Sequence, residues 1–281
     1  AGPAVRTENE ATAFCSRLFE DLFDEWYWRP ALYYRWAFAE DSRLMSNQIA
    51  RTLVRDMRMP LFVRRLFVLR RQRVVYLQKD GVTKQTAPIL ESLYMDSLRA
   101  LDTVFANRPF LFGDRPCEAD FGLFGPFFRH FFCDPTPGAL MRTHAPHLTH
   151  WVTRLWKTRP ADLAGKKPIS GVPNDLGFFF DLCANDYLPY LEANAKAVAD
   201  AAANTRYVSG GANWEILAAP YRANCFNELK RRFADLSPEA KRDVREVLPQ
   251  AGIDLLEEPM THGEPIAGLP GRLGRRAAQF D

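Results

Sequence analysis

The run Pro116-Cys117-Glu118-Ala119-Asp120-Phe121 constrains the fold more than any other part of this chain, because it predicts a capped helix that is apolar nearly all round. Asp120 falls at the third helical position, from which its carboxylate can accept the backbone N–H of Cys117. A carboxylate there also faces the positive end of the helix dipole. The residues that follow, 121–128, are almost entirely apolar, so we expect this helix to lie inside the domain.

Helical patterns before and after this run outline a first domain over residues 1–165. Residues 8–40 predict a long aromatic helix, in which Arg29 continues a stripe of apolar residues spaced three or four apart. Pro30 is expected to kink or split that helix. A further amphipathic helix is predicted to begin at Thr86-Ala87-Pro88 and to reach Phe105.

A linker rich in glycine, proline and lysine, residues 165–173, introduces an extension over residues 174–258. Its first helix is predicted from about 175 to 203, with a kink at Pro189. Ser209-Gly210-Gly211-Ala212 predicts a small hairpin near 206–216. Two more helices are expected, the second begun by Ser237-Pro238. Residues 259–281, with scattered glycines and arginines, are expected to form a flexible tail.

The segment from Phe110 to Asp120 resembles the one that precedes the central helix in the all-helical C-terminal domain of cytosolic glutathione transferases. The resemblance continues through Asp134-Pro135-Thr136-Pro137, Ala145-Pro146-His147-Leu148 and Trp151-Val152-Thr153-Arg154-Leu155. One departure is Cys117, which stands where the family has serine or threonine and which accepts a hydrogen bond poorly. Asp120 keeps its half of the cap.

The resemblance covers roughly residues 8–258. Asp24-Glu25-Trp26 and Tyr34-Arg35-Trp36 are similar to a run in a bacterial subgroup that carries a helix, a short two-stranded turn and two more helices after the standard fold. The resemblance implies an all-α fold, namely a glutathione-transferase C-terminal-type helical bundle plus a mostly helical extension with a small β-hairpin.

In that family, a thioredoxin-like βαβ domain precedes the helices, binds glutathione and activates its thiol. This chain is already in an apolar helical pattern by Thr12, so we expect that domain to be absent from the chain as given. The resemblance implies the helical, substrate-binding half of a glutathione-transferase-like protein that acts on a small hydrophobic electrophile with glutathione as co-substrate. It also implies a homodimer with a two-fold interface. The alternative is a non-catalytic interaction module that uses the same fold.

The candidate substrate-binding residues are aromatic residues of the first helices: Trp26, Tyr27, Tyr33, Tyr34 and Trp36. Such rings can wall a pocket for an apolar electrophile, and tyrosine hydroxyls can stabilise a developing anion. The same residues can instead pack in a core, with their OH and NH groups bonded at its margin. The sequence leaves both interpretations open, and it assigns no catalytic residue.

Residues 43–73 carry nine arginines against the single acid Asp56. The arginines alternate with apolar residues such as Phe62 and Leu66, which predicts amphipathic helices with solvated charged faces. Because no nucleic-acid-binding motif accompanies the charge, no nucleic-acid partner is expected.

Other kinds of site find little support. His144, His147 and His150 are spaced by three, but Pro146 is expected to begin a helix after the first of them, and no metal site is predicted. Cys117 is interpreted as a small cap residue, because nearby acids oppose a thiolate. No stretch reaches the ~18 apolar residues of a membrane span, so no membrane partner is expected. Five scattered cysteines indicate reduced thiols and a cytoplasmic protein.

Overall fold

A computed structural model describes residues 9–167 and 171–259, and within these ranges the fold is all-α apart from one two-stranded hairpin, as predicted. The first domain contains α1 (Glu10–Glu25), α2 (Trp28–Ala37), α3 (Ala39–Arg51), α4 (Leu61–Arg71) with the π turn η1 (Gln72–Leu77), α5 (Ala87–Asn107), α6 (Glu118–Pro126) with the π turn η2 (Phe127–Phe132), α7 (Pro135–His144) and α8 (Pro146–Lys157). The extension contains α9 (Gly177–Leu182), the π turn η5 (Cys183–Tyr187), α10 (Leu188–Ala199), β1 (Asn204–Ser209), β2 (Ala212–Leu217), α11 (Pro220–Ala234), α12 (Pro238–Val247) and α13 (Gln250–Glu257).

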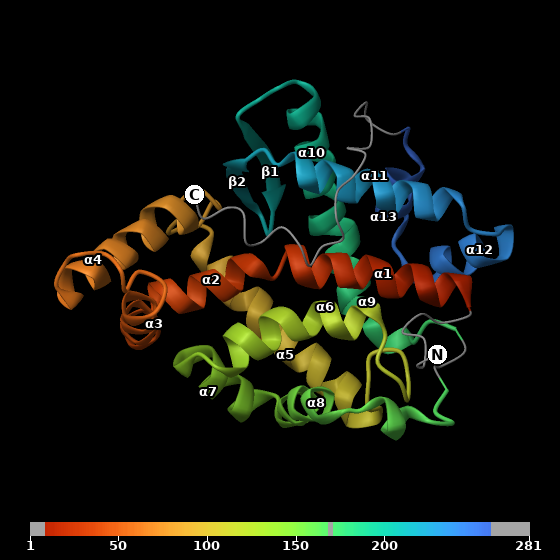
Figure 1. Cartoon of the computed structure of the whole chain (residues 1–281). Coiled ribbons are helices and arrows are strands. Elements are labelled where there is room, and N and C mark those ends of the chain that lie inside the picture. Colours follow the sequence, from red (N-terminus) through yellow and green to blue (C-terminus); the bar gives the residue numbers. More distant parts are fainter. Residues whose placement is uncertain (1–8, 168–170, 260–281) are drawn as a thin grey trace.

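Helices α1 and α2 follow one another across the middle of the molecule (Figure 1). In this view α5 to α8 lie below them, the hairpin and α10 to α13 lie above them, and α3 and α4 project to the left. The break between α1 and α2 falls at Trp26 and Tyr27, one turn before Pro30. Pro30 is the third residue of α2, where a helix has no intrahelical partner for its N–H groups, so proline removes no hydrogen bond.

Helix α6 packs closely on α1 because Gly122 lets the two backbones approach. A Cβ atom at Gly122 would lie 2.7 Å from the carbonyl oxygen of Glu20 and 2.8 Å from its Cα. The other side of α6 is open, and Phe121 is 51% exposed. The expectation of burial all round is therefore wrong for that side, because Phe121 points away from the face that α1 covers.

The extension follows the expected order with one addition. The π turn η5 comes directly before Pro189, where a kink was predicted. β1 and β2 pair antiparallel, and the turn residues Gly210 and Gly211 have φ of +57° and +76°, as a type I′ turn requires. The hydroxyl of Ser237 accepts the N–H of Ala240 at 3.2 Å and begins α12. Helix α13 is a third helix that the sequence did not predict.

One hydrophobic core joins the first domain to the extension. The ring of Phe14 in α1 lies 5.5 Å from that of Phe233 in α11, measured between centroids, and Phe19 lies 4.6 Å from Phe180 in α9. Helix α1 therefore packs on both parts. The domain boundary at residues 165–174 stays a prediction, and the predicted tail lies outside the described residues apart from Pro259.

Candidate functional site

All five candidate aromatic residues are buried in hydrophobic core clusters. Tyr27 is fully buried, and its hydroxyl is hydrogen-bonded to Ser97 Oγ at 2.6 Å. The ring of Tyr34 stacks on Phe38, with 5.1 Å between centroids. Trp36 belongs to a small separate cluster between α2, α3, α4 and η1, which also contains Leu32, Met45, Val68 and Leu77.

Tyr33 and Trp26 belong to the same main core cluster as Tyr27 and Tyr34. The hydroxyl of Tyr33 donates a hydrogen bond to the carboxylate of Glu91 in α5. Burial, and then the hydrogen bond and charge of Glu91, raise the pKa of Tyr33, so this hydroxyl stays protonated. Trp26 faces the extension, with its ring 5.5 Å from that of Tyr190. Within the described residues, the five side chains therefore divide between two hydrophobic core clusters.

Next to Trp26 lies Arg29, a buried arginine in the first turn of α2. Its guanidinium carbon is 4.6 Å from the ring centroid of Trp26, 4.5 Å from that of Tyr190 and 5.8 Å from that of Tyr207. Arg29 is only 2% exposed, and none of its three side-chain nitrogens has a hydrogen-bond acceptor in the described part of the chain. A buried charge without hydrogen bonds is costly, and the aromatic faces offset only part of that cost.

Further donors without acceptors surround this guanidinium. Trp26 Nε1 and the hydroxyls of Tyr190 and Tyr207 are buried and have no hydrogen-bond partner among the described residues. Burial raises the pKa of Tyr207 to about 12, so its hydroxyl keeps its proton at neutral pH. We call Trp26, Arg29, Tyr190 and Tyr207 the Arg29 cluster. In this cluster, several buried donors of the described residues surround one guanidinium.

Three charged groups border the Arg29 cluster. Arg222 of α11 forms an ion pair with Glu25, with 3.5 Å between Nε and Oε2, and its guanidinium carbon is 5.7 Å from the ring centroid of Tyr190. Asp80 lies in the turn after η1. Burial raises the pKa of Asp80, although the charges of Arg29 and Arg222 act in the opposite direction. The acids around Arg29 are thus either already paired or less acidic than usual.

Sequence reasoning found Trp26 in this cluster and missed the rest. The available signal was Arg29 itself, a charged residue at a position of an otherwise apolar stripe. Tyr190, Tyr207 and Arg222 belong to the extension, and no local pattern relates them to α2. Only the packing of α10, β1 and α11 brings them to Arg29.

The predicted helix cap forms a buried network around Asp120. Oδ2 accepts the N–H of Cys117 at 3.0 Å and its thiol at 3.3 Å. Oδ1 accepts the N–H of Leu111 at 3.0 Å and Trp151 Nε1 at 3.1 Å. Ser16 of α1 adds a further cap, since its hydroxyl accepts the N–H of Ala119 at 3.2 Å. Every one of these contacts stabilises the start of α6, so the network is structural.

The thiol of Cys117 is not activated. Burial, and then the charge of Asp120, raise its pKa well above the ordinary range. A thiol in this state is neither a good nucleophile nor a metal ligand. Among the described residues, Cys133 is the one exposed cysteine, and burial raises its pKa too.

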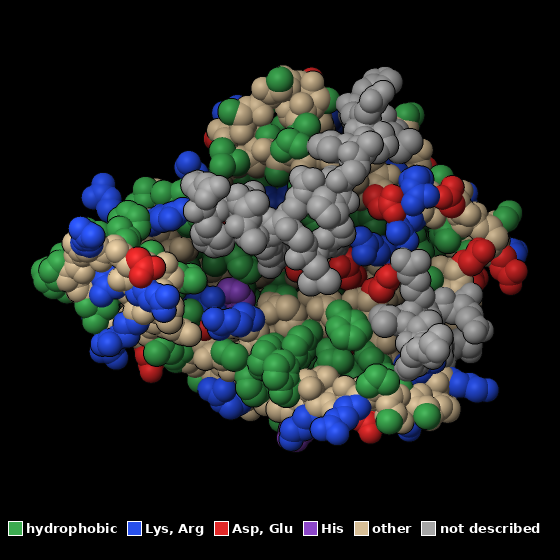
Figure 2. Space-filling view, in the orientation of Figure 1, with side chains coloured by type: hydrophobic (Ala, Val, Ile, Leu, Met, Phe, Trp, Pro, Cys, Tyr) green, Lys and Arg blue, Asp and Glu red, His purple; other side chains and the backbone are tan. Residues whose placement is uncertain are grey.

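Two surfaces outside the Arg29 cluster expose apolar side chains. The first, which we call the aromatic face, consists of Phe121, Phe124, Phe128 and Trp156 on α6, η2 and α8. Phe128 stacks on Phe124 and on Trp156, with 4.9 and 5.0 Å between centroids, and Trp156 is 66% exposed. Figure 2 shows hydrophobic side chains gathered in the region of α6 and α8. Exposed apolar patches of this kind mark interaction sites.

The second surface is the α3–α4 lobe, the projecting pair of helices. Leu53, Phe62 and Leu66 are 73%, 71% and 66% exposed, and exposed arginines lie among them (Figure 2). Most of the arginines are exposed as predicted, whereas the Nε atoms of Arg64 and Arg65 are buried. The apolar side chains are solvated as well, because the lobe projects from the body and α4 buries only Val68.

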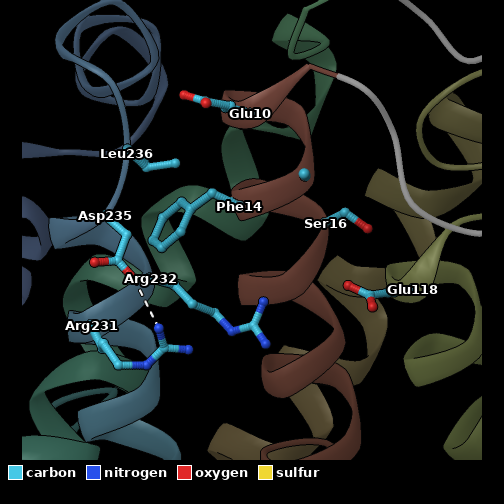
Figure 3. Close-up of a pocket in the computed structure, with 9 residues that line it drawn as sticks. Glu10, Phe14, Ser16, Glu118, Arg231, Arg232, Asp235 and Leu236 are labelled. Carbon is cyan, nitrogen blue, oxygen red and sulfur yellow. Dashed lines mark hydrogen bonds and ion pairs between the residues drawn. The ribbon is translucent and has the colours of Figure 1, made fainter.

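A pocket of about 320 Å³ lies between α1, α11 and the start of α6 (Figure 3). Its arginines are already paired, Arg231 with Asp235 and Glu228 at 2.8 and 2.9 Å, and Arg232 with Glu228 at 2.6 Å. These arginines are paired with acids at the C-terminal end of α11, so they offer a ligand few unpaired charges.

The histidines do not form a metal site. His147 Nδ1 lies 3.0 Å from Asp102 Oδ2, and α8 begins at Pro146, so His144 lies outside that helix as predicted. Within residues 9–167 and 171–259 no group of three His, Cys, Asp or Glu residues is placed to hold a metal ion. None of the described helices has the length and apolar character to cross a membrane.

Comparison with known proteins identifies the helical bundle. Residues 57–158, from just before α4 to the end of α8, match the model of the glutathione S-transferase C-terminal domain. The match confirms the resemblance drawn from the segment Phe110 to Asp120. No curated protein and no solved structure matches the chain.

Proposed function

Because this chain carries a glutathione S-transferase C-terminal domain at residues 57–158, we propose that it is the helical, substrate-binding half of a glutathione S-transferase-like protein. In this proposal the thiol of glutathione attacks a hydrophobic electrophile. Activation of the thiol belongs to a thioredoxin-like domain that works with these helices. The observation that carries the proposal is the family match over α4 to α8. Reduced, mostly buried cysteines support a cytoplasmic location.

Trp26 is the residue that we assign to the electrophile. Its ring and that of Tyr190 lie 5.5 Å apart with the guanidinium of Arg29 against both, and we propose that they contact the aromatic part of an electrophile beside that cation. Tyr27 and Tyr34 belong to the same core as Trp26, Trp36 lies in the separate small cluster, and Tyr33 bonds Glu91 of α5. We place the thiol-activating domain on the aromatic face. Stacked apolar rings suit a protein interface, and helical domains of this family act together with a thiol-activating domain.

Replacing Trp26 by phenylalanine tests the assignment. In a protein that includes the thiol-activating domain, the KM for 1-chloro-2,4-dinitrobenzene is expected to rise by roughly fivefold, because part of the apolar wall is lost. The KM for glutathione should not change. Trp28→Phe is the matched control, since Trp28 lies two residues away and packs on His130 at 5.0 Å. Equal effects of the two substitutions would remove Trp26 from the electrophile's site.

One observation favours the alternative, a non-catalytic interaction module: the α3–α4 lobe exposes apolar residues with arginines around them. Charge complementarity selects an acidic protein surface as its partner. Glu40 and Asp56 are the exposed acids of the lobe and are outnumbered by its arginines, so pairing with a second copy would bring arginines together. If the chain nevertheless forms a homodimer through the lobe, Phe62→Ser together with Leu66→Ser should make it monomeric. Sedimentation measures this change. The interaction module predicts no response to glutathione.

A further inference from the structure

The Arg29 cluster contains more buried donors than the protein itself uses. The guanidinium of Arg29, the indole N–H of Trp26 and the hydroxyls of Tyr190 and Tyr207 all lack a hydrogen-bond acceptor within the described residues. Native proteins pair nearly all such groups, and each exception requires an explanation. Six of the twelve such atoms in the described part of the chain belong to these four residues around one cation, and a single acceptor group could serve them.

The acids among the described residues do not fill this role. Glu25 is 3.5 Å from Arg222 and thus serves the other arginine. Asp80 forms no hydrogen bond that satisfies Arg29. Burial also raises the pKa of Asp80, which favours its neutral form more than in an exposed aspartate. Within residues 9–167 and 171–259, the cation at Arg29 therefore has aromatic faces around it but no oxygen acceptor.

We propose that the Arg29 cluster is a binding site for the carboxylate of a small organic acid. The planar guanidinium presents parallel N–H groups that match the two oxygens of a carboxylate. The indole N–H and the two hydroxyls add neutral donors around the same anion. The surrounding rings give an apolar wall to the rest of the ligand. The proposal shares Trp26 and Tyr190 with the site proposed above for the electrophile, but it requires no glutathione chemistry.

The charges around the cluster favour an anion with a single charge. Two guanidinium groups, Arg29 and Arg222, face two carboxyl groups, Glu25 and Asp80. Because burial shifts Asp80 toward its neutral form, one added negative charge is balanced better here than two. A doubly charged phosphate would overcompensate, and it would also repel Glu25.

The site also gives the extension a role. Arg29 and Trp26 belong to the region at the start of α2, whereas Tyr190, Tyr207 and Arg222 come from α10, β1 and α11. The turn that holds Asp80 continues to Gly81, which lies close to β2. A Cβ atom added at Gly81 would be 3.0 Å from the side chains of Trp214 and Ile216. Without the extension, Arg29 would lose two of its three aromatic neighbours.

The test measures the melting temperature of the full chain in sodium acetate, phosphate or chloride at equal ionic strength and pH 7. At about ten times its Kd, acetate should raise the melting temperature by about 3–5 °C, and chloride and phosphate should raise it less. Titration calorimetry should give one acetate per chain. Arg29→Met should abolish the rise. Its own melting temperature in acetate-free buffer should be equal or higher, because an unpaired buried charge has been removed.

Two more variants complete the test. Arg206→Met is the matched control, because Arg206 is exposed on β1 and pairs with Glu215 at 3.1 Å, so it should respond to acetate like the wild type. Tyr207→Phe removes one hydroxyl that has no acceptor and should weaken acetate binding severalfold. This variant tests the proposal independently if Arg29→Met fails to fold. Equal rises with all three salts, or an acetate response kept by Arg29→Met, would overturn the proposal. A preference for phosphate would overturn the carboxylate assignment.

Discussion

Replacing Asp120 by alanine is expected to lower the free energy of unfolding by about 3–5 kcal/mol, because three buried N–H groups lose their acceptor at once. These are the backbone groups of Leu111 and Cys117 and the indole of Trp151. Urea denaturation monitored by circular dichroism measures the loss. Asp114→Ala, an exposed carboxylate in the same loop, is the control and should cost less than about 0.5 kcal/mol. A small cost at Asp120 would show that α6 does not depend on this network.

The same carboxylate should make stability depend on pH. Burial raises the pKa of Asp120 from 3.8 to about 6, although its hydrogen bonds act in the opposite direction. The folded protein therefore holds this proton more tightly than the unfolded chain does. The resulting stabilisation is fully present below pH 4 and is lost as pH rises through 6. Relative to Asp120→Asn, the wild type should lose stability on the order of 3 kcal/mol between pH 4 and 7. A flat difference would contradict the raised pKa.

Gly122→Ala should destabilise the protein by about 2–3 kcal/mol, although alanine is the better helix former. The new methyl group would lie 2.7 Å from the backbone oxygen of Glu20, so α1 and α6 would have to separate. Gly125→Ala in the same helix is the matched control. Its nearest neighbour is Asp24 Oδ1 at 3.9 Å, so the change should stabilise the protein by about 0.5–1 kcal/mol.

Thermal unfolding of the two variants side by side separates packing from helix propensity. Opposite shifts in melting temperature support close contact of α1 with α6. If Gly122→Ala stabilised the protein as Gly125→Ala does, the two helices would not pack backbone to backbone.

The features that sequence predicted are those whose chemistry is local. Asp120 and Cys117 are three residues apart, Gly210 and Gly211 occupy one turn, and Ser237 caps the helix that it precedes. In each case the residues that interact are neighbours in the chain, so their spacing alone specifies the geometry.

The features that sequence missed depend on distant segments. Trp151 completes the Asp120 network from 31 residues away, and Ser16 reaches Ala119 across 103 residues. The open side of α6 could not be predicted, because a helix that is apolar all round gives no sign of which face its neighbours cover. The Arg29 cluster likewise arises only when the extension packs on α2.

The most direct test of the proposed function is the melting temperature of the complete natural protein with and without millimolar glutathione. A protein in which these helices serve glutathione chemistry should be stabilised by several degrees, because ligand that binds only the folded state raises the melting temperature. An unchanged melting temperature would contradict the assignment to a glutathione transferase and leave the interaction module as the function of this fold.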